Sequence, residues 1–410
     1  MTTEAWIIDA ARTPRGIGKQ GKGALAHLHP QHLGATVLKA LRDRNDIDTR
    51  DVDDVVWGCS SQKGKQGVCL GRMSVLLAEW DTAASAVTLD RFCGSGITSV
   101  NMAAASIMAG MEDLVVAGGT EMMSYTTAQQ TAGLLDAENP ALRDLHPQFH
   151  QGICADLIAT QEGITRDDVD QLALRSQQRA KVALDEGRYD RSLVPVHNAD
   201  GSVALDTEQF PRPQTTLEGL GKLPAVFQYF MPEPFDESGE TFDHLVKRVY
   251  PDVKINHVHH AGNSSGVVDG SAALLLTSPE YAKARGWKPR ARIRAMANAA
   301  GSPELMLNEP VPAARKVLKK AGMALSDIDL FEINEAFAVV AFKFMRDLEL
   351  DPASVNVNGG AIALGHPIAA TGSILIGTLL DELERQDLTT GLVTMCAAGG
   401  MAPAVVIERI

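Results

Sequence analysis

The feature that most constrains this fold is an internal repeat of a turn, a helix and a strand that ends in Gly-Gly. In the first copy the turn is Cys93–Gly96, and in the second copy it is Gly365–Pro367. A chain that repeats one βαβ-type unit is expected to form two similar α/β halves. The turns that carry Cys93 and His366 would then occupy equivalent positions, and a pseudo-twofold axis would bring them together.

Between the two copies, the character of the chain changes. Residues 121–250 are acidic, contain prolines and show less regular patterning than the flanking segments. One stretch, Thr165–Glu186, has the pattern of a helix, with Thr165 at the N-cap and acids in the first turn. We interpret this block as an excursion from a core that resumes after residue 250.

Composition excludes several classes of function. The chain has 410 residues, enough for two or three core units, and a net charge of −13 that argues against nucleic acid as a main partner. An anionic ligand must therefore be held by local groups. No apolar run approaches the length of a membrane span. Five cysteines without a Cys-x-x-Cys pair predict free thiols, and with the acidic N-terminus they favour a cytoplasmic location.

Cys93 lies where a short strand, Val87–Leu89, meets a helix predicted over Ile97–Gly110. A thiol beside the first free N–H groups of a helix is expected to have a lowered pKa, because the helix dipole favours the thiolate. The adjacent glycines permit close approach of another group. Cys93 is therefore a candidate nucleophile, and the alternative is a buried structural cysteine.

Three further candidates lie at strand ends or glycine-rich turns, where ligands bind in α/β folds. Asn334 follows a strand predicted over Ile328–Ile333 and either caps a helix or orients a water or a carbonyl group. His366 has glycine and alanine neighbours that leave room for a ligand, and an imidazole titrates near neutral pH. Cys396 ends a strand and can exchange a proton as a neutral thiol.

The segment His257-Val258-His259-His260 raises the alternative of a metal site. On a strand, His257 and His259 would face one side and His260 the other. Zinc sites need three or four convergent ligands, and no third ligand has suitable spacing. We therefore predict no metal site here.

A thiol, an imidazole and a second thiol together suit acyl transfer through a thioester. A protease would need only the first two groups and an oxyanion hole. A second acid or base is required when a carbon–carbon bond is made or broken, because a carbon acid must then gain or lose a proton.

Over nearly its whole length the chain resembles the thiolase family, which includes acetyl-CoA acetyltransferases and 3-ketoacyl-CoA thiolases. The resemblance implies an α/β fold with a duplicated βαβαβαββ core, layered α-β-α-β-α, and an inserted loop domain. The implied domains are an N-terminal core (1–120 and 251–278), the loop domain (121–250) and a C-terminal core (279–410). Four blocks carry the match: Cys93-Gly94-Ser95-Gly96, Asn334-Glu335-Ala336-Phe337-Ala338, Gly359-Gly360-Ala361-Ile362-Ala363-Leu364-Gly365-His366-Pro367 and Cys396-Ala397-Ala398-Gly399-Gly400.

The resemblance also implies residue roles and substrates. Cys93 would carry the acyl group, and His366 would take the proton of the Cys93 thiol. Cys396 would act as acid or base at Cα of the acyl group, and Asn334 would hold a water. The reaction would be ping-pong thiolysis of 3-ketoacyl-CoA or the reverse condensation, with CoA thioesters as substrates, no permanently bound cofactor, and a homodimer or homotetramer as the assembly. The remaining implied groups are the backbone N–H groups of Cys93 and Ala398 in an oxyanion hole, Ser265 at the pantetheine arm, and His150, Met306 and Phe337 along the acyl or pantetheine channel.

The sequence departs from the family pattern at several of these places. Ala398 replaces a common glycine, and Leu307-Asn308-Glu309-Pro310 replaces a Gly-Thr-Gly-Pro type of turn. Gln151 and Val268 stand where methionine and asparagine are common, and the basic residue expected just before Pro224 is missing. The alternative function is a catalytically silent acyl-CoA- or lipid-binding protein of the same fold, which would usually lack one of the four catalytic side chains. A condensing synthase of the wider superfamily would need a second active-site histidine, and no matching turn carries one.

Overall fold

The computed structural model describes residues 4–128, 134–236 and 238–410. The described strands form one mixed sheet in the order β10-β11-β12-β9-β1-β8-β5-β3-β4, with β2 paired to the first residues of β8, and a separate hairpin of β6 and β7. The strands are β1 (Trp6–Arg12), β2 (Gly16–Ile17), β3 (Asp54–Gly58), β4 (Val87–Leu89), β5 (Leu114–Met122), β6 (Val196–His197), β7 (Val203–Leu205), β8 (Val268–Thr277), β9 (Ala291–Ala300), β10 (Leu330–Ile333), β11 (Thr390–Thr394) and β12 (Met401–Arg409).

The sheet consists of two halves with the same topology. In the first half, β3 and β5 are parallel and β8 runs antiparallel between β5 and β1; in the second, β10 and β11 are parallel and β12 runs antiparallel between β11 and β9. Within the sheet of the described residues, the halves meet at a two-residue pairing of β1 with β9, between Trp6 and Arg292 and between Ile7 and Ala291. The duplicated α/β fold that the repeat predicts is therefore confirmed.

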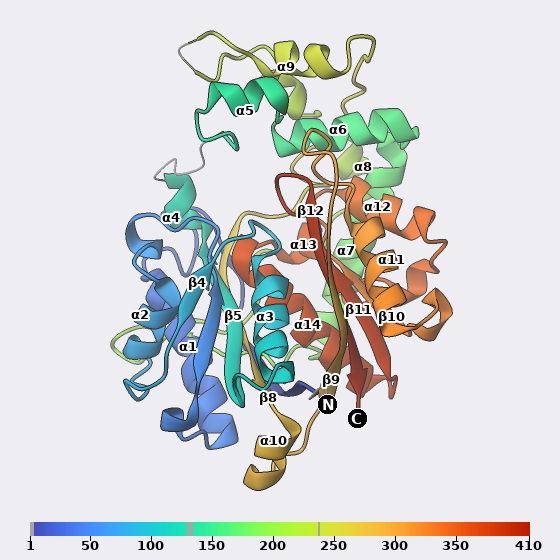
Figure 1. The fold of residues 1–410 in the computed structure, drawn as a ribbon. Coiled ribbons are helices and arrows are strands. Elements are labelled where there is room, and N and C mark those ends of the chain that lie inside the picture. The colour runs from blue at the N-terminus through green and yellow to red at the C-terminus, as the bar shows by residue number, and fades with distance from the viewer. Residues whose placement is uncertain (1–3, 129–133, 237) are drawn as a thin grey trace.

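Helices α3 (Ser95–Met108) and α14 (Ile368–Arg385) form the middle layer of the molecule. Figure 1 shows both helices between the strands of the two halves, and α14 packs on β5 and β8 as well as on β11. A Cβ built on Gly96 would lie 2.8 Å from the Ala369 oxygen, so the two helices touch through their backbones. The Ser373 hydroxyl also donates to the Gly96 oxygen at 3.2 Å.

Other helices cover the outer faces and complete the α-β-α-β-α layering. Helices α1 and α2 pack on the first half, and α11 and α12 belong to the second. Helix α12 begins at Ala338, and in the turn before it the Glu335 side chain accepts hydrogen bonds from the Ser176 hydroxyl and the Asn356 amide. The helices of the core are α1 (Pro30–Asn45), α2 (Leu70–Leu77), α10 (Pro279–Arg285), α11 (Pro310–Ala321), α12 (Ala338–Asp347) and α13 (Ala361–Leu364), and the short 3-10 helices of the chain span Thr49–Asp51, Gly64–Gln66, Phe227–Phe230, Leu325–Asp327 and Pro352–Ser354.

The acidic block is more helical than its sequence indicates. Helix α7 has the predicted position and a capping box between Thr165 and Asp168, but α6 and α9 were not expected. Figure 1 shows α5, α6 and α9 gathered at one end of the molecule. The division of the chain into three domains stays a prediction. The helices of this block are α4 (Met123–Ala128), α5 (Pro140–Leu145), α6 (Gln151–Glu162), α7 (Arg166–Asp185), α8 (Leu217–Gly221) and α9 (Phe242–Val249).

A buried ion cluster ties this block to the first half of the core. Glu208 accepts hydrogen bonds from Arg12 at 2.7 Å and from Arg15 at 2.8 Å, and all three side chains are almost fully buried. Although burial opposes ionisation, the charges of Arg15 and Arg12 lower the pKa of Glu208 to about 2. The glutamate is therefore ionised at neutral pH and compensates the two guanidinium groups.

Candidate active site

A strained turn holds Cys93 two residues before α3. Phe92 has a φ of +50°, a conformation that costs a non-glycine residue roughly 1–3 kcal/mol. The Ser95 hydroxyl accepts from the Arg91 N–H at 2.8 Å and donates to the Phe92 oxygen at 2.7 Å, which holds the turn in place. A Cβ on Gly94 would lie 2.9 Å from the Pro403 ring, so the turn packs directly on β12.

His366 occupies the equivalent turn before α14 and is 5% exposed. Gly365 before it has a φ of +92°, which favours glycine. The His366 N–H donates to the Gly266 oxygen at 2.9 Å. Its ring has one partner on each side: Nδ1 lies 2.5 Å from the Thr371 hydroxyl, and Nε2 lies 3.3 Å from the Asn334 amide nitrogen.

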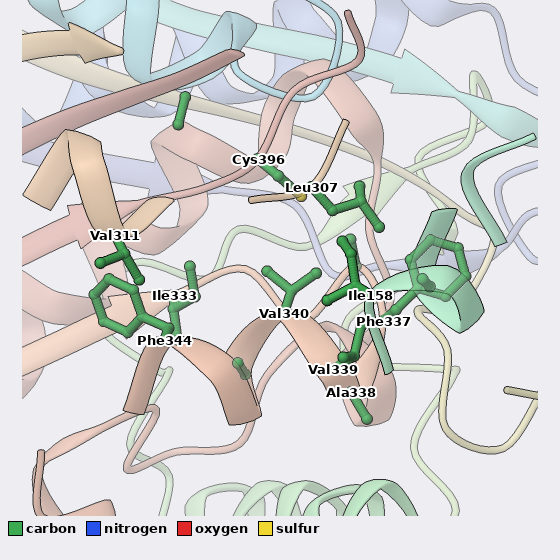
Figure 2. Close-up of a cluster of buried hydrophobic side chains, with 14 of the residues drawn as sticks. Ile158, Leu307, Val311, Ile333, Phe337, Ala338, Val339, Val340, Phe344 and Cys396 are labelled. Carbon is green, nitrogen blue, oxygen red and sulfur yellow. The ribbon is translucent and has the colours of Figure 1, made fainter. Parts of the chain in front are cut away.

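Asn334 and Cys396 follow the ends of two neighbouring parallel strands. Ile333 of β10 pairs with Thr394 of β11, and the Asn334 N–H donates to the Thr394 oxygen at 3.3 Å. The buried Asn334 Oδ1 has no hydrogen-bond partner among the described residues, so it is available to a bound water or ligand. Cys396 is buried, and Figure 2 shows it with Leu307 and Phe337 among the side chains of one apolar cluster.

The turn after Cys396 is a tight hairpin into β12. The Ala397 N–H donates to the Met401 oxygen at 2.7 Å, and the Met401 N–H returns a bond of 3.1 Å. Gly399 and Gly400 both have φ near +75°. Ala398 lies half-buried in this turn, with an alanine accommodated where the family often has glycine.

Packing brings the Cys93 and His366 turns side by side. A Cβ built on Gly58 would lie 2.9 Å from the Ser95 Cβ and 3.1 Å from the Ala369 oxygen, which follow Cys93 and His366 in the chain. The buried Glu121 carboxylate accepts from the Ala369 N–H at 3.3 Å, and its charge also acts on Cys93. The two thiols are electrostatic neighbours, since Cys93 contributes to raising the pKa of Cys396.

The expected lowering of the Cys93 pKa is wrong for the unliganded protein. Desolvation, followed by the negative charge of Glu121, raises the pKa of Cys93 to about 12. Desolvation and then the Arg15 charge lower the pKa of His366 to about 3. The effect of the helix dipole, typically below 1 kcal/mol, is the smaller influence here. The resting site therefore holds a neutral thiol and a neutral imidazole that can accept its proton.

The four residues that the resemblance assigns to substrate binding are linked to one another by packing contacts and one backbone hydrogen bond. The Phe337 ring meets Phe227 edge to face at 5.6 Å, and His150 lies 5.5 Å from Phe227. Met306 is buried in the same cluster as Phe337 and Cys396. Ser265 lies next to this wall, because its N–H donates to the Ala336 oxygen at 2.9 Å.

The histidine-rich segment is bound to carboxylates. His257 and His259 each contact Asp156 at 2.7 Å, and His260 contacts Asp170 at 2.9 Å. These acids belong to α6 and α7, so the contacts fasten the histidine-rich segment, which is an irregular stretch and not a strand, to the acidic block. Within the part of the chain that the structure describes, no cluster of three or more side chains could hold a metal ion.

A cleft of about 210 Å³ opens beside this segment. Arg212 lies on its wall, with the guanidinium 5.7 Å from the centre of the Phe210 ring. The cleft provides a local cation within an acidic protein, as the overall charge requires of any site for an anionic ligand. Its lining consists of Gln177, Phe210, Arg212, Gln214, Thr215, Thr216, Gly219, Leu220, Leu223, Ala261, Gly262 and Ile362.

Sequence reasoning missed two residues that support this site, Thr371 and Glu121. Thr371 lies five positions after His366, within the first turn of α14, a spacing that permits contact with the ring. Glu121 follows the Gly-Gly of β5, where the sequence showed only the start of an acidic block. The partners of Glu121, by contrast, are Ser60, Gln66 and Ala369, which lie far from it in the chain.

Comparisons with known proteins agree with this geometry. Family models for the thiolase N-terminal and C-terminal domains match residues 5–229 and 287–409. A steroid 3-ketoacyl-CoA thiolase from Mycobacterium tuberculosis is 38% identical, over 100% of this chain and 95% of its own length. A 3-ketoacyl-CoA thiolase from Marinomonas sp. is 36% identical over 98% of both chains. The crystal structure of human mitochondrial 3-ketoacyl-CoA thiolase superposes with a TM-score of 0.84 at 32% identity, over 100% of each chain.

The duplicated fold, the paired turns at its centre and these matches along almost the whole chain lead to one conclusion: the chain belongs to the thiolase family.

Proposed function

We propose that this thiolase transfers an acyl group from a 3-ketoacyl-CoA to coenzyme A through a thioester on Cys93. The observation that carries the proposal is the His366 ring, bonded to Asn334 and packed in a turn beside that of Cys93. Cys396 lies at the end of the neighbouring strand.

In the first half-reaction, His366 Nε2 takes the Cys93 proton as Sγ attacks the 3-keto carbon. The bond between C2 and C3 breaks, and its electron pair stays on C2 of the departing acetyl-CoA enolate. The Cys396 thiol protonates C2 and becomes a thiolate. In the second half-reaction, the Cys396 thiolate takes the proton of free CoA, whose sulfur attacks the thioester; Cys93 leaves and recovers its proton from His366. The same steps in reverse give the Claisen condensation.

Two groups of donors would stabilise the developing negative charge. The N–H groups of Cys93 and Ala398 would hold the oxygen of the acyl group on Cys93. A water bound at Asn334, together with His366 Nε2–H, would hold the enolate oxygen. One such donor is typically worth about 10²–10³ in rate.

The CoA moiety would occupy the cleft that contains Arg212, with the pantetheine arm passing Ser265 towards Phe337. The guanidinium supports this placement because it is a local cation suited to phosphate in a chain of net charge −13. No permanently bound cofactor is required by the chemistry. The aromatic wall of His150, Phe227 and Phe337 favours an apolar acyl group.

Covalent labelling tests the proposal. The protein is incubated with acetoacetyl-CoA, quenched in acid and digested, and we expect an acetyl adduct on the Cys93 peptide that Cys93→Ala does not form. Intact protein without the adduct would contradict the mechanism. CoA-dependent loss of acetoacetyl-CoA absorbance separates an enzyme from the silent binding protein, and kcat/KM across 3-ketoacyl-CoAs of increasing length and bulk defines the acyl preference.

We further propose a homodimer, alone or within a homotetramer, formed through the β4 edge. In the sheet formed by the described residues β4 is the last strand, and an unpaired edge is a template for pairing with another chain. Apolar side chains around it are exposed, including Val68 at 81% and Val87 at 43%. Light scattering should give at least twice the mass of one chain, and Val87→Lys should reduce that mass. Met111→Lys, at a more exposed apolar site outside this edge, should leave the mass unchanged. A wild type with the mass of one chain would overturn the proposal.

We place the protein in the cytoplasm, since the described cysteines are all free thiols, as in reducing compartments. Within the described residues, no helix combines the length and apolar character needed to cross a bilayer.

A further inference from the structure

We infer that Thr371 is a positioning residue for His366, because its hydroxyl holds the imidazole in the tautomer in which Nε2 is unprotonated and can accept the Cys93 proton. The inference rests on the proposed role of His366 as the base for Cys93.

The hydrogen-bond partners of the Thr371 hydroxyl determine which ring nitrogen carries the proton. Oγ1 lies 3.1 Å from the Pro367 oxygen and 2.5 Å from His366 Nδ1. The hydroxyl donates its single hydrogen to the Pro367 oxygen, which can only accept. Oγ1 then offers only lone pairs to the ring, and Nδ1 must be the donor. In the neutral imidazole, the proton is therefore on Nδ1 and the lone pair is on Nε2.

The opposite side of the ring requires the same tautomer. The Asn334 amide nitrogen, a donor only, lies 3.3 Å from His366 Nε2. The Asn334 donor therefore selects the tautomer with a lone pair on Nε2, and the bond from the Thr371 hydroxyl to Pro367 leaves Oγ1 ready to accept from Nδ1–H. Both Thr371 and His366 are almost fully buried, at 1% and 5% exposure, so bulk water does not compete for Nδ1.

The position of Thr371 in α14 also fixes the direction of its hydroxyl. Its N–H and its hydroxyl both bond to the Pro367 oxygen, four residues earlier, so the side chain cannot turn to another acceptor without losing a buried bond. When Nε2 receives the Cys93 proton, the ring becomes cationic and the bond from Nδ1–H to Oγ1 becomes charge-assisted and stronger. Thr371 therefore supports the proton transfer as well as the resting tautomer.

A matched pair of variants tests this role. Thr371→Val keeps the branched shape and removes the hydroxyl, whereas Thr371→Ser keeps the hydroxyl. Loss of a buried hydrogen bond to Nδ1–H is expected to slow acylation of Cys93 by acetoacetyl-CoA about 10- to 100-fold, as measured by rapid acid quench. We expect kcat/KM for thiolysis to fall by the same factor with KM for CoA unchanged, and Thr371→Ser to recover most of the rate.

Nitrogen-15 NMR of histidine-labelled protein reads the tautomer directly and does not depend on turnover. The wild type and Thr371→Ser should show His366 with a protonated Nδ1 and an unprotonated Nε2, while Thr371→Val should show a mixture. A wild type with Nε2 protonated at rest would overturn the inference, even if the valine variant failed to fold.

Acylation of Cys93 distinguishes failure of the positioning role from failure of the proposed function. If wild type forms the Cys93 adduct but Thr371→Val acylates at the same rate, the positioning role is wrong and the proposed function stands. If the wild type forms no adduct on Cys93, the proposed function itself fails.

Discussion

The contact between α3 and α14 can be used to test whether helix packing positions Cys93 relative to His366. A Cβ added at Gly372 would lie 2.2 Å from the Ile97 backbone nitrogen and 2.8 Å from the Gly96 carbonyl carbon. Both neighbours are backbone atoms, so no side chain can rotate to make room. Restoring an ordinary contact, with carbon about 3.5 Å from its neighbour, requires the helices to separate by roughly 1 Å.

This separation affects stability and activity differently. Overpacking of a dense interior costs about 1–3 kcal/mol, and the gain of about 1 kcal/mol from replacing glycine in a helix offsets part of it. Activity should suffer more, because Cys93 precedes α3 and His366 precedes α14. A misplacement of about 1 Å between reacting groups can reduce the rate by about 100-fold. Gly372→Ala should therefore fold with a small loss of stability and a large loss of kcat/KM.

A second glycine of α14 provides the control. At Gly377, the nearest neighbour of an added Cβ is the Ala10 Cβ at 3.2 Å, a side-chain atom distant from the two turns. Gly377→Ala should keep wild-type kcat/KM for thiolysis of acetoacetyl-CoA, with stability in urea unchanged or raised. If Gly372→Ala retained both the wild-type kcat/KM and the wild-type unfolding midpoint, the backbone contact would not set the distance between the Cys93 and His366 turns.

Two further predictions concern buried carboxylates. Burial raises the pKa of Asp269 to about 6, above the usual value of about 3.9, so the folded state binds the proton more tightly than the unfolded chain. The free energy of unfolding should fall by about 3 kcal/mol as the pH rises from about 4 to 6. Asp269→Asn should flatten this part of the profile of unfolding free energy against pH, measured in urea. Parallel profiles for the variant and the wild type would contradict the prediction. Glu208→Gln should destabilise the protein by about 3–5 kcal/mol, because Arg12 and Arg15 lose their compensating charge. The carboxylate contribution is present above about pH 4.3 and is lost as the pH falls through 2, so in urea unfolding the difference between Glu208→Gln and the wild type should shrink at low pH; a constant difference would contradict the assignment.

Local patterns were sufficient to predict much of the fold. The repeat of turn, helix and strand predicted two similar halves, and the capping residues of Thr165–Glu186 predicted α7. These signals are local, because turn glycines, caps and apolar periodicity act within a few residues of each other. Helix α6 was missed for the same reason. Residues 152–159 are buried around its whole circumference, so its sequence has no polar face to mark a helical period.

In the candidate site, the sequence identifies the residues, whereas the structure sets their electrostatic state. Cys93, Asn334, His366 and Cys396 are found by residue type at strand ends and glycine-rich turns, and their assigned roles stay a prediction. Their electrostatic state depends on neighbours that are remote in the chain. The helix dipole is a property of local sequence, but the desolvation and the Glu121 charge that raise the Cys93 pKa are consequences of packing.

The sequence by itself determined which chemical groups this protein has, in what order they occur, and that its two halves repeat one unit. Only the tertiary structure decided that α3 and α14 touch through glycine backbones, that Thr371 holds one nitrogen of His366 while Asn334 meets the other, and that the resting thiol is neutral. Side-chain type and short spacing are encoded locally, whereas distance, burial and local field arise only when segments hundreds of residues apart pack together.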